Sequence, residues 1–311
     1  MQRPLTQVLA AKAFFEKLED RMKKFFFNVL ALLMTLFCTT TPLTAQEKVP
    51  PGEVIPKMFP TSAEIIGGRI AVAGEGINTG RFYQYQTGVV SSATLLNNNL
   101  AVITAHSLCG ITPNGGSFVW GDRNSREVEF TEQTTQLITY TVHPKFKCGV
   151  AGAYDVAVVL IAPVEYNSAV GPTFLSTRTI SEAISFQSFG FGRIAKDGPP
   201  SEQLKVANMK LVSVYTTDAL GPTLLYEGID GDPYRGDSGG PITCRFPRDY
   251  NLYMCGTNSA IGENDQGKIF IFSPDISQYV DFILQSATNF GVLVELRAPF
   301  TNAAFVPIAI R

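Results

Sequence analysis

Histidine is scarce in this sequence: His106 and His143 are the only two among 311 residues. No cluster of His, Cys, Asp and Glu has metal-ligand spacing, and no glycine-rich phosphate loop is present. Long runs of Lys or Arg are missing too, and the formal net charge is −2. These absences argue against a metal or other cofactor, a nucleic-acid partner and a polybasic membrane patch.

Near the N-terminus, no hydrophobic run is long enough to cross a membrane. The apolar residues 25–37 fall short of the roughly 20 residues that a spanning helix needs. They follow Lys23-Lys24 and lead to small residues ending at Ala45, a pattern typical of a signal peptide. We interpret residues 1–45 as a leader and signal peptide, with an uncleaved membrane anchor as the alternative. The expected product is secreted, extracellular or periplasmic, with no stable membrane association after cleavage.

Removal of this leader would leave four of the five cysteines. An even number of cysteines in an exported chain predicts two disulfides, because exported proteins fold in oxidising compartments. Sequence alone permits three pairings of the four residues. They are Cys109, Cys148, Cys244 and Cys255.

Short apolar runs broken by Gly, Asn and Pro make up the chain from Ile65 onward. The polar, proline-rich residues 46–64 before them are interpreted as a propeptide or linker. Residues 89–96 and 100–104 flank three asparagines, which predicts a strand, a turn and a strand. Residues 156–161 are continuously apolar, as in a buried strand. Many short strands without helical periodicity indicate an all-β sandwich or barrel.

One helix is expected late in the chain. Ser273 and Pro274 offer an N-cap and a first-turn proline. Four apolar residues then recur on one helical face: Ile276, Val280, Ile283 and Leu284. Residues 289–311 beyond them are apolar without a clear pattern, and we treat them as a C-terminal extension.

The sharpest local motif is Gly236-Asp237-Ser238-Gly239-Gly240-Pro241. Glycines on both sides of a serine permit a tight turn that presents the hydroxyl and directs backbone N–H groups at an oxyanion. Ser238 is therefore the candidate nucleophile, with an ordinary glycine-rich loop as the alternative.

The order of the candidate groups along the chain narrows the chemistry. Both histidines precede Ser238, which excludes the α/β-hydrolase order of serine, acid and histidine. No Asp lies within residues 46–105, so the subtilisin order survives only as Asp122, His143 and Ser238. The order His, Asp, Ser remains. We favour His106 over His143, because His106 ends an apolar strand that can hold its ring rigidly, whereas His143 precedes a proline.

Asp155 is the candidate acid. It enters the apolar residues 156–161, so its carboxylate is expected to be buried, and burial is costly unless the charge is paired. Pairing with the ring of His106 would fix the tautomer and stabilise the imidazolium. A turn residue at a strand edge is the alternative.

Together, four motifs in this order resemble the chymotrypsin (trypsin-like) serine protease family over residues 65–287. Ile65-Ile66-Gly67-Gly68 resembles the mature N-terminus of the family. Thr104-Ala105-His106 resembles its histidine motif, without the usual second alanine. Asp155-Val156-Ala157-Val158-Val159 resembles the aspartate motif, and residues 236–241 resemble the serine motif.

The resemblance implies two six-stranded antiparallel β-barrels with a C-terminal helix. Residues 65–170 would form the first barrel and residues 171–288 the second barrel with the helix, before the extension at 289–311. The implied protein is a monomeric serine endopeptidase that acts on polypeptides.

The resemblance also implies peptide-bond hydrolysis through an acyl-enzyme. Ser238 would attack the carbonyl, His106 would move the proton and Asp155 would orient His106. The N–H groups of Gly236 and Ser238 would form the oxyanion hole.

Zymogen activation is a further implication. Cleavage before Ile65 would create an α-amine that pairs with Asp237 and orders the oxyanion hole, unless a side chain holds Asp237 instead. Because Glu64 precedes the cut, a trypsin-like enzyme would not readily activate itself.

Substrate preference follows from the resemblance less directly. Asp232, six residues before the nucleophile, falls at the base of the family's specificity pocket and would favour Lys or Arg at the scissile bond. An ordinary acidic turn at residues 230–233 is the alternative. Two departures favour that alternative: Tyr234 replaces the cysteine that braces the pocket, and the pocket wall reads Ser259-Ala260-Ile261, where Ile261 would narrow the entrance.

The cysteines also depart from the family, whose usual partners for two of them are missing. The resemblance leaves Cys148 as the mate of Cys109. It leaves Cys255, across an expected hairpin, as the mate of Cys244.

Two other functions compete with the endopeptidase. A non-catalytic binding protein on a protease fold is disfavoured, because such relatives typically lose the serine or the histidine. An esterase using the same three residues is the second alternative.

Overall fold

The computed structural model describes the backbone of residues 57–59 and, beyond it, residues 65–72, 74–121, 132–149, 154–167, 170–176, 178–193, 195, 198–217, 220–249 and 251–297. The chain divides into two units, residues 1–55 and 56–311, and every described residue belongs to the second unit. The expected leader, most of the expected propeptide and most of the C-terminal extension lie outside the described residues. Within the described part, no helix has the length and apolar character needed to cross a membrane.

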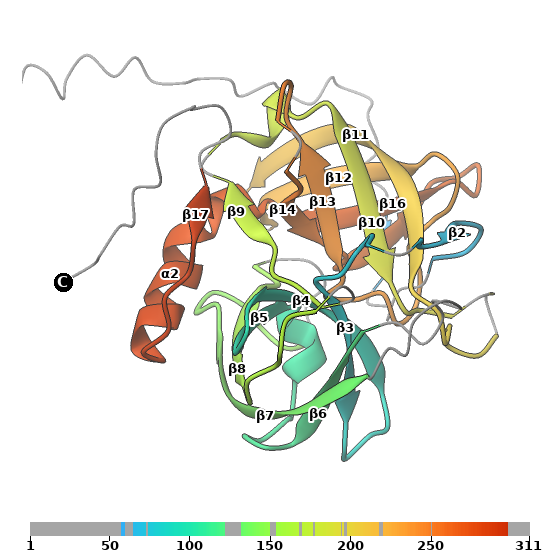
Figure 1. Ribbon diagram of the computed structural model, residues 1–311. Helices are drawn as coiled ribbons and strands as arrows, with labels where there is room; N and C mark the ends of the chain where they lie inside the picture. Colours follow the sequence, from blue (N-terminus) through green and yellow to red (C-terminus); the bar gives the residue numbers. More distant parts are fainter. Residues whose placement is uncertain are drawn as a thin grey trace, which may run out of the picture. The chain divides into compact units, whose positions relative to one another are not determined.

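The first half of the described chain forms a closed antiparallel barrel, in the order β3-β4-β5-β8-β7-β6 (Figure 1). Its strands are β3 (Thr79–Gln84), β4 (Val90–Asn97), β5 (Leu100–Ile103), β6 (Gly116–Trp120), β7 (Gln133–Val142) and β8 (Ala157–Ile161). β4 and β5 form the hairpin predicted around the asparagines, and β8 is the predicted buried strand, paired on both sides. Burial on both faces explains why its sequence does not alternate.

Large aromatic side chains fill the interior of this barrel. Phe82 stacks on Phe118, with ring centroids 4.7 Å apart, and Phe118 stacks on Trp120 at 5.6 Å. All three side chains are fully buried. The indole N–H of Trp120 donates to Thr135 Oγ1 at 3.0 Å, so the one polar atom of this stack is satisfied.

The second sheet has eleven strands, in the order β1-β15-β16-β12-β11-β10-β13-β14-β9-β17, with β2 paired to β11. Its strands are β1 (Lys57–Phe59), β2 (Arg69–Ile70), β9 (Phe174–Ser176), β10 (Ser185–Gly190), β11 (Lys205–Thr217), β12 (Gly221–Gly228), β13 (Pro241–Arg245), β14 (Tyr253–Thr257), β15 (Ala260–Glu263), β16 (Ile269–Pro274) and β17 (Leu296–Arg297). The expected all-β class is confirmed, and one closed six-stranded barrel beside a second sheet is consistent with the expected two-barrel architecture. The second sheet is larger than a six-stranded barrel because short strands such as β1, β2, β9 and β17 add to it.

The expected C-terminal helix is present as α2 (Val280–Asn289), but it begins later than predicted. Ser273 and Pro274 end β16 by pairing with β12, instead of capping a helix. Asp275 caps the short helix η3 (Ile276–Gln278) by accepting the N–H of Ser277 at 3.1 Å.

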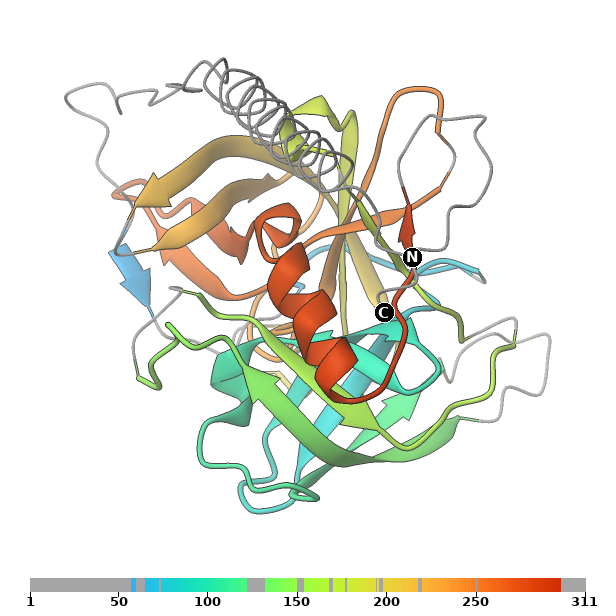
Figure 2. The ribbon, with the colours of Figure 1, turned by 90° about the vertical axis from the view of Figure 1, so that its left-hand side faces the viewer.

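Helix α2 packs against both halves of the protein (Figure 2). Its buried Ile283 belongs to one apolar cluster with Val102 and Val158 of the barrel and with Leu175 and Met254 of the second sheet. Burying one fully exposed aliphatic side chain of this size contributes about 1.5–3 kcal/mol. The helix therefore holds the two halves together beside β5 and β8, the strands that carry the site.

Candidate active site

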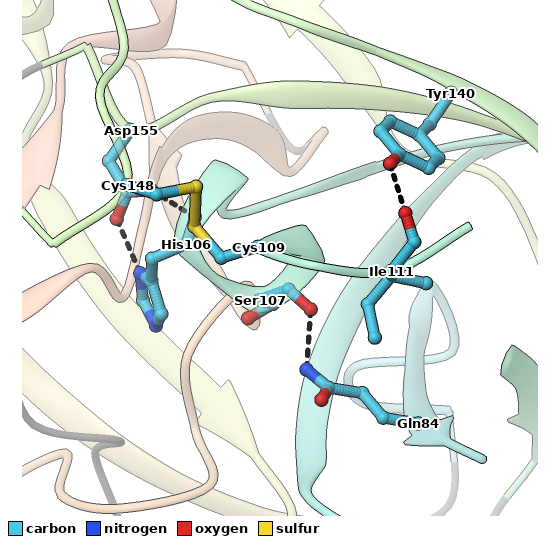
Figure 3. Close-up of a disulfide and its surroundings, with 8 residues drawn as sticks. All are labelled: Gln84, His106, Ser107, Cys109, Ile111, Tyr140, Cys148 and Asp155. Atoms are coloured by element: carbon cyan, nitrogen blue, oxygen red, sulfur yellow. Dashed lines mark hydrogen bonds and ion pairs between the residues drawn. A yellow bond between two sulfur atoms is a disulfide. The ribbon is translucent and has the colours of Figure 1, made fainter. Parts of the chain in front are cut away.

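His106 lies directly after β5, in the short helix η1 (Ala105–Leu108). Its Nδ1 is 2.7 Å from Asp155 Oδ2, and its backbone N–H donates to Asp155 Oδ1 at 2.8 Å. Figure 3 shows the ring turned toward Asp155 through Nδ1, which leaves the other ring nitrogen pointing away from the carboxylate. The imidazole is thus held at one end and is one-third exposed.

Asp155 lies two residues before β8 and is buried, at 1% exposure. The pairing of Ile103 with Ala157 across β5 and β8 brings the residues just beyond these strand ends together. The hydroxyl of Ser259 donates to Asp155 Oδ2 at 2.5 Å, in addition to the two bonds with His106. Three hydrogen bonds thus compensate the cost of burying this carboxylate, as the sequence led us to expect.

Each partner shifts the pKa of the other. Burial alone would lower the pKa of His106, but the charge of Asp155 and its hydrogen bond outweigh burial and raise it above the ordinary 6.5. Burial would raise the pKa of Asp155, but the charge and hydrogen bonds of His106, with that of Ser259, lower it overall. The pair therefore favours an ionised Asp155 and a more basic His106.

Ser238 lies in a tight turn between residues with positive φ. Gly236 has φ +100° and Gly239 has φ +85°, a region in which residues with a Cβ are strained. Ser238 itself is buried, and its backbone carbonyl accepts the N–H of Ser92 at 2.8 Å. The sequence expectation of a tight turn made by flanking glycines is met.

The Ser238 turn is seated on the end of the strand that leads to His106. A Cβ on Gly239 would lie 2.7 Å from Ile103 Cγ1 and 3.2 Å from Thr104 N, so the turn touches the chain two residues before His106. Ser92 of β4 adds a second anchor, since its hydroxyl donates to the carbonyl of Gly236 at 3.0 Å. The structure thus brings the serine turn and the His106–Asp155 pair to one place.

Two supporting residues, Ser92 and Asn258, were missed in the sequence. Asn258 Nδ2 donates to the carbonyl of Asp237 at 3.4 Å, and its Oδ1 accepts from Ser188 at 2.9 Å. Both residues are fully buried. The available signal was at Ser92, a polar side chain within the apolar strand β4, because such groups are buried only with partners. Asn258 lies between β14 and β15 and had no such signal.

Asp237, the proposed partner of a new N-terminus, is fully buried. Its Oδ1 accepts the N–H of Gly192 at 2.8 Å and its Oδ2 accepts the N–H of Tyr234 at 3.1 Å. Ile65 is buried as well, and Ile66 exchanges two backbone hydrogen bonds with Asp232, at 2.7 and 2.9 Å. The expected mature N-terminus is therefore anchored to the loop that leads to Ser238.

The predicted pocket residues fall near the same loop. Asp232 is partly exposed, and its pKa is raised chiefly by burial and by Glu227, against the N–H of Gly228 and the charge of Lys268. Ile261 of β15 stands opposite Ile271 of β16.

Both isoleucines are buried, at 8% and 0% exposure, in one cluster with Tyr226. Ile261, the expected wall residue, therefore has a large aliphatic neighbour, Ile271, that the sequence did not single out.

His143 has a different environment. Its ring stacks on Tyr154 with centroids 5.1 Å apart and meets Tyr279 and Phe282 edge-on at 5.3 and 5.0 Å. Burial and the charge of Lys145 lower its pKa. The structure pairs Asp155 with His106, and Asp122, the acid of the alternative order, lies outside the described residues.

Both disulfides are present in the pairing that the resemblance implied. Cys109–Cys148 joins the end of η1 to the segment after β7 and lies beside His106 (Figure 3). Cys244–Cys255 links the paired strands β13 and β14. Among the described residues, no group of His, Cys, Asp and Glu could hold a metal ion.

A family model described as Trypsin matches residues 65–283 of the chain. The match covers more than half of the protein, so the chain belongs to the trypsin family and carries a trypsin-like serine protease domain.

Two curated proteins are similar to this chain. Chymotrypsin-like elastase family member 1 of Rattus norvegicus is 27% identical over 248 residues, which cover 72% of this chain and 90% of the rat protein. Ovochymase of Halocynthia roretzi is 22% identical over 249 residues, which cover 73% of this chain but 15% of ovochymase. These similarities support proteolysis as the activity, but they do not identify the substrate.

Proposed function

We propose that this protein is a serine endopeptidase that cleaves polypeptides through an acyl-enzyme, with Ser238, His106 and Asp155 as its catalytic triad. The observation that carries the proposal is the hydrogen bonding of Asp155 to His106 and Ser259, beside a serine turn seated on β5. A buried carboxylate raising the pKa of the adjacent imidazole is what a general base requires.

In the proposed reaction, Ser238 Oγ attacks the peptide carbonyl while the ring nitrogen of His106 remote from Asp155 takes the proton. His106 then gives this proton to the leaving amine, and water hydrolyses the ester by the same route. Asp155 orients His106 and stabilises its charged form. The N–H groups of Gly236 and Ser238 would hold the oxyanion, and the positive φ of Gly236 supports this orientation.

Activation by cleavage before Ile65 belongs to the same proposal. The new amine of Ile65 would pair with Asp237, whose carboxylate is already fixed by two backbone N–H groups. The two backbone hydrogen bonds between Ile66 and Asp232 support a coupling between the new N-terminus and the loop that carries Asp232. N-terminal sequencing of active protein tests this step, and a start other than Ile65 would rule it out.

The finer proposal on specificity is a preference for Lys or Arg before the scissile bond, which rests on the Asp232 carboxylate. A preference for small apolar side chains is the second candidate. Ile261 favours it, because a branched side chain at the expected pocket wall would narrow the entrance for a long side chain. Its cross-strand neighbour Ile271 lies beside it on the same face of the sheet and is buried too. Cleavage rates of matched chromogenic peptides ending in Arg, Phe or Ala would decide between them.

The finer organisation of the chain is also proposed. Residues 1–45 direct secretion and are removed, residues 46–64 form a propeptide, and the barrels comprise residues 65–170 and 171–288. Two disulfides in the described part of the chain favour an oxidising compartment. The mature protein is proposed to act as a monomer, and residues 289–311 as an extension.

Labelling with an alkyl fluorophosphonate tests the nucleophile. The chain cut before Ile65 should be labelled, and Ser238→Ala should abolish the label. Ser181→Ala, at an exposed serine of the short helix Ile180–Glu182, is the matched control and should label like wild type. Absence of label in the cut wild-type chain would favour a non-catalytic binding protein on the protease fold. Matched amide and ester substrates would separate a peptidase from an esterase.

A further inference from the structure

Strand β15 (Ala260–Glu263) begins at the candidate active site. The residue before it, Ser259, donates its hydroxyl to Asp155 at 2.5 Å. One edge of β15 pairs with β16 along its whole length. The other edge therefore extends outward from the site and is the place where a further strand can add to this end of the sheet.

That other edge is occupied by the chain's own β1 (Lys57–Phe59), drawn in blue at the left of Figure 2. The pairing is antiparallel, with Lys57 opposite Glu263, Met58 opposite Gly262 and Phe59 opposite Ile261. β1 thus runs toward Ser259 as the chain proceeds. It comes from the segment before Ile65, the expected start of the mature protein.

An extended peptide binds most simply to a protein by adding a strand to an exposed sheet edge, where main-chain hydrogen bonds supply affinity for any sequence. In the described part of the protein, β15 offers such an edge next to the site, because it follows directly after Ser259, which is hydrogen-bonded to Asp155. A peptide substrate aligned on this edge and β1 would use the same N–H and C=O groups. The two cannot bind at the same time.

We propose that β1 is an intramolecular inhibitory strand: residues 57–59 occupy the substrate-docking edge of β15 until the chain is cut before Ile65. The proposal rests on the proposed protease function, because it assigns that edge to the substrate. The cut is a hydrolysis that adds one water and leaves a carboxylate on the released segment and an amine on Ile65. In the uncut chain, residues 60–64 tether β1 to the rest of the protein and give it an effective concentration on the order of millimolar near β15. A contact of only three residue pairs can therefore persist.

Cutting removes this tether. Only three residue pairs then remain to hold a separate peptide, so the released segment leaves and β15 becomes an open edge. Activation by this route differs from the Asp237 pairing: it depends on strand occupancy and not on the new amine.

Hydrogen exchange of the backbone amides of β15 tests occupancy directly. The chain is studied as Ser238→Ala, which cannot process itself under the proposed function. In this background, Lys57→Pro/Met58→Pro is compared with Gly52→Pro/Glu53→Pro, a matched pair in the same segment outside β1. Successive N–H groups point to opposite edges of a strand, so one of the two prolines at 57 and 58 must remove a donor to β15.

We expect the β15 amides that face β1 to exchange about tenfold faster or more in the 57/58 variant and in the chain cut before Ile65. The 52/53 control should match the uncut parent. Equal exchange in all four proteins would overturn the proposal.

The ratio of two labelling rates supplies the functional readout in the chain with Ser238 intact. A tetrapeptidyl phosphonate needs the β15 edge, whereas an alkyl fluorophosphonate needs only the serine. Cutting should raise the peptidyl-to-alkyl ratio about tenfold or more, and adding excess synthetic peptide of residues 54–61 to the cut chain should lower it. An unchanged ratio would contradict the inhibitory strand. Failure of the proposed function would show differently, as no alkyl label on the cut chain.

Discussion

The two halves of the protein differ in how their strands end. The first barrel is closed, so each of its six strands has a neighbour on both sides. The second sheet is open and ends in short strands, β1 beyond β15 and β17 beyond β9. Closure removes edges and favours rigidity, whereas an open edge can accept a peptide. The closed half carries His106 and Asp155, which need fixed geometry, and the open half carries the Ser238 turn and the strand on which we place the substrate.

The largest expected effect separates the two histidines. Substituting His106→Ala should lower kcat by about 10⁴-fold to 10⁶-fold, because it removes the proposed general base, the imidazole paired with Asp155. His143→Ala removes an aromatic stack and should reduce stability, but kcat per folded molecule should stay within a few-fold of wild type. Hydrolysis rates normalised to the folded fraction measure both, and comparable losses would refute the assignment of the base.

The next effect concerns the carboxylate of the closed barrel. Asp155→Asn should lower kcat by about 10⁴-fold, because an amide stabilises neither the tautomer nor the charge of His106. Ser259→Ala removes one of the three hydrogen bonds to Asp155, the one that comes from the open half. It should lower kcat by about tenfold or less. The ratio of the two kcat values measures how strongly the site depends on each half. A larger loss from Ser259→Ala would reverse the proposed hierarchy.

Core truncations compare the packing of the two halves. Trp120→Ala in the closed barrel should lower the free energy of unfolding by about 3–5 kcal/mol, since it leaves a large cavity and an unpaired Thr135. Phe270→Ala, at a partly buried residue of β16 in the second sheet, should cost about half as much. Urea denaturation of both variants provides the measurement. Equal costs would mean that closure adds nothing to the packing.

The disulfides provide a smaller comparison. Cys109–Cys148 spans 39 residues and Cys244–Cys255 spans 11, so loop entropy alone predicts contributions of about 4 and 3 kcal/mol. Replacing each pair by alanines should therefore cost about 1 kcal/mol more in the closed half. Thermal unfolding of the two double variants measures the difference, and the reverse order would show that burial of the second pair dominates.

The smallest expected effect is a shift in pH dependence. The pKa of His106 is raised above 6.5, and the protonated ring cannot accept a proton from Ser238. Activity should therefore be present at higher pH and fall as the pH drops through a value above 6.5. The acid limb of kcat/KM against pH measures it. An acid limb below 6.5 would show that burial outweighs Asp155 in the free enzyme.

Much of the fold and the outline of the site could be predicted from the sequence. Alternating and continuous apolar runs predicted β4, β5 and β8, because strand burial leaves a local signature. The order of His106, Asp155 and Ser238 selected one arrangement of the three. The geometry of Asp155 was also foreseeable, because a carboxylate inside an apolar run must find partners.

Long-range pairing set the features that the sequence did not reveal. Ser273 and Pro274 carry local signals of a helix start, yet pairing with β12 keeps them in β16. The docking of β1 onto β15 joins segments some 200 residues apart, with no local pattern in residues 57–59 to indicate it. Ser92 and Asn258 were missed for the same reason, since their partners lie on distant strands.

The most direct test of the central claim is the covalent intermediate itself. The chain cut before Ile65 is mixed with a peptide ester, quenched in acid and mapped by mass spectrometry. We expect one acyl group per molecule, on the peptide that contains Ser238, and none in the Ser238→Ala variant. Peptide cleavage with no acyl group, or an acyl group on another residue, would contradict it.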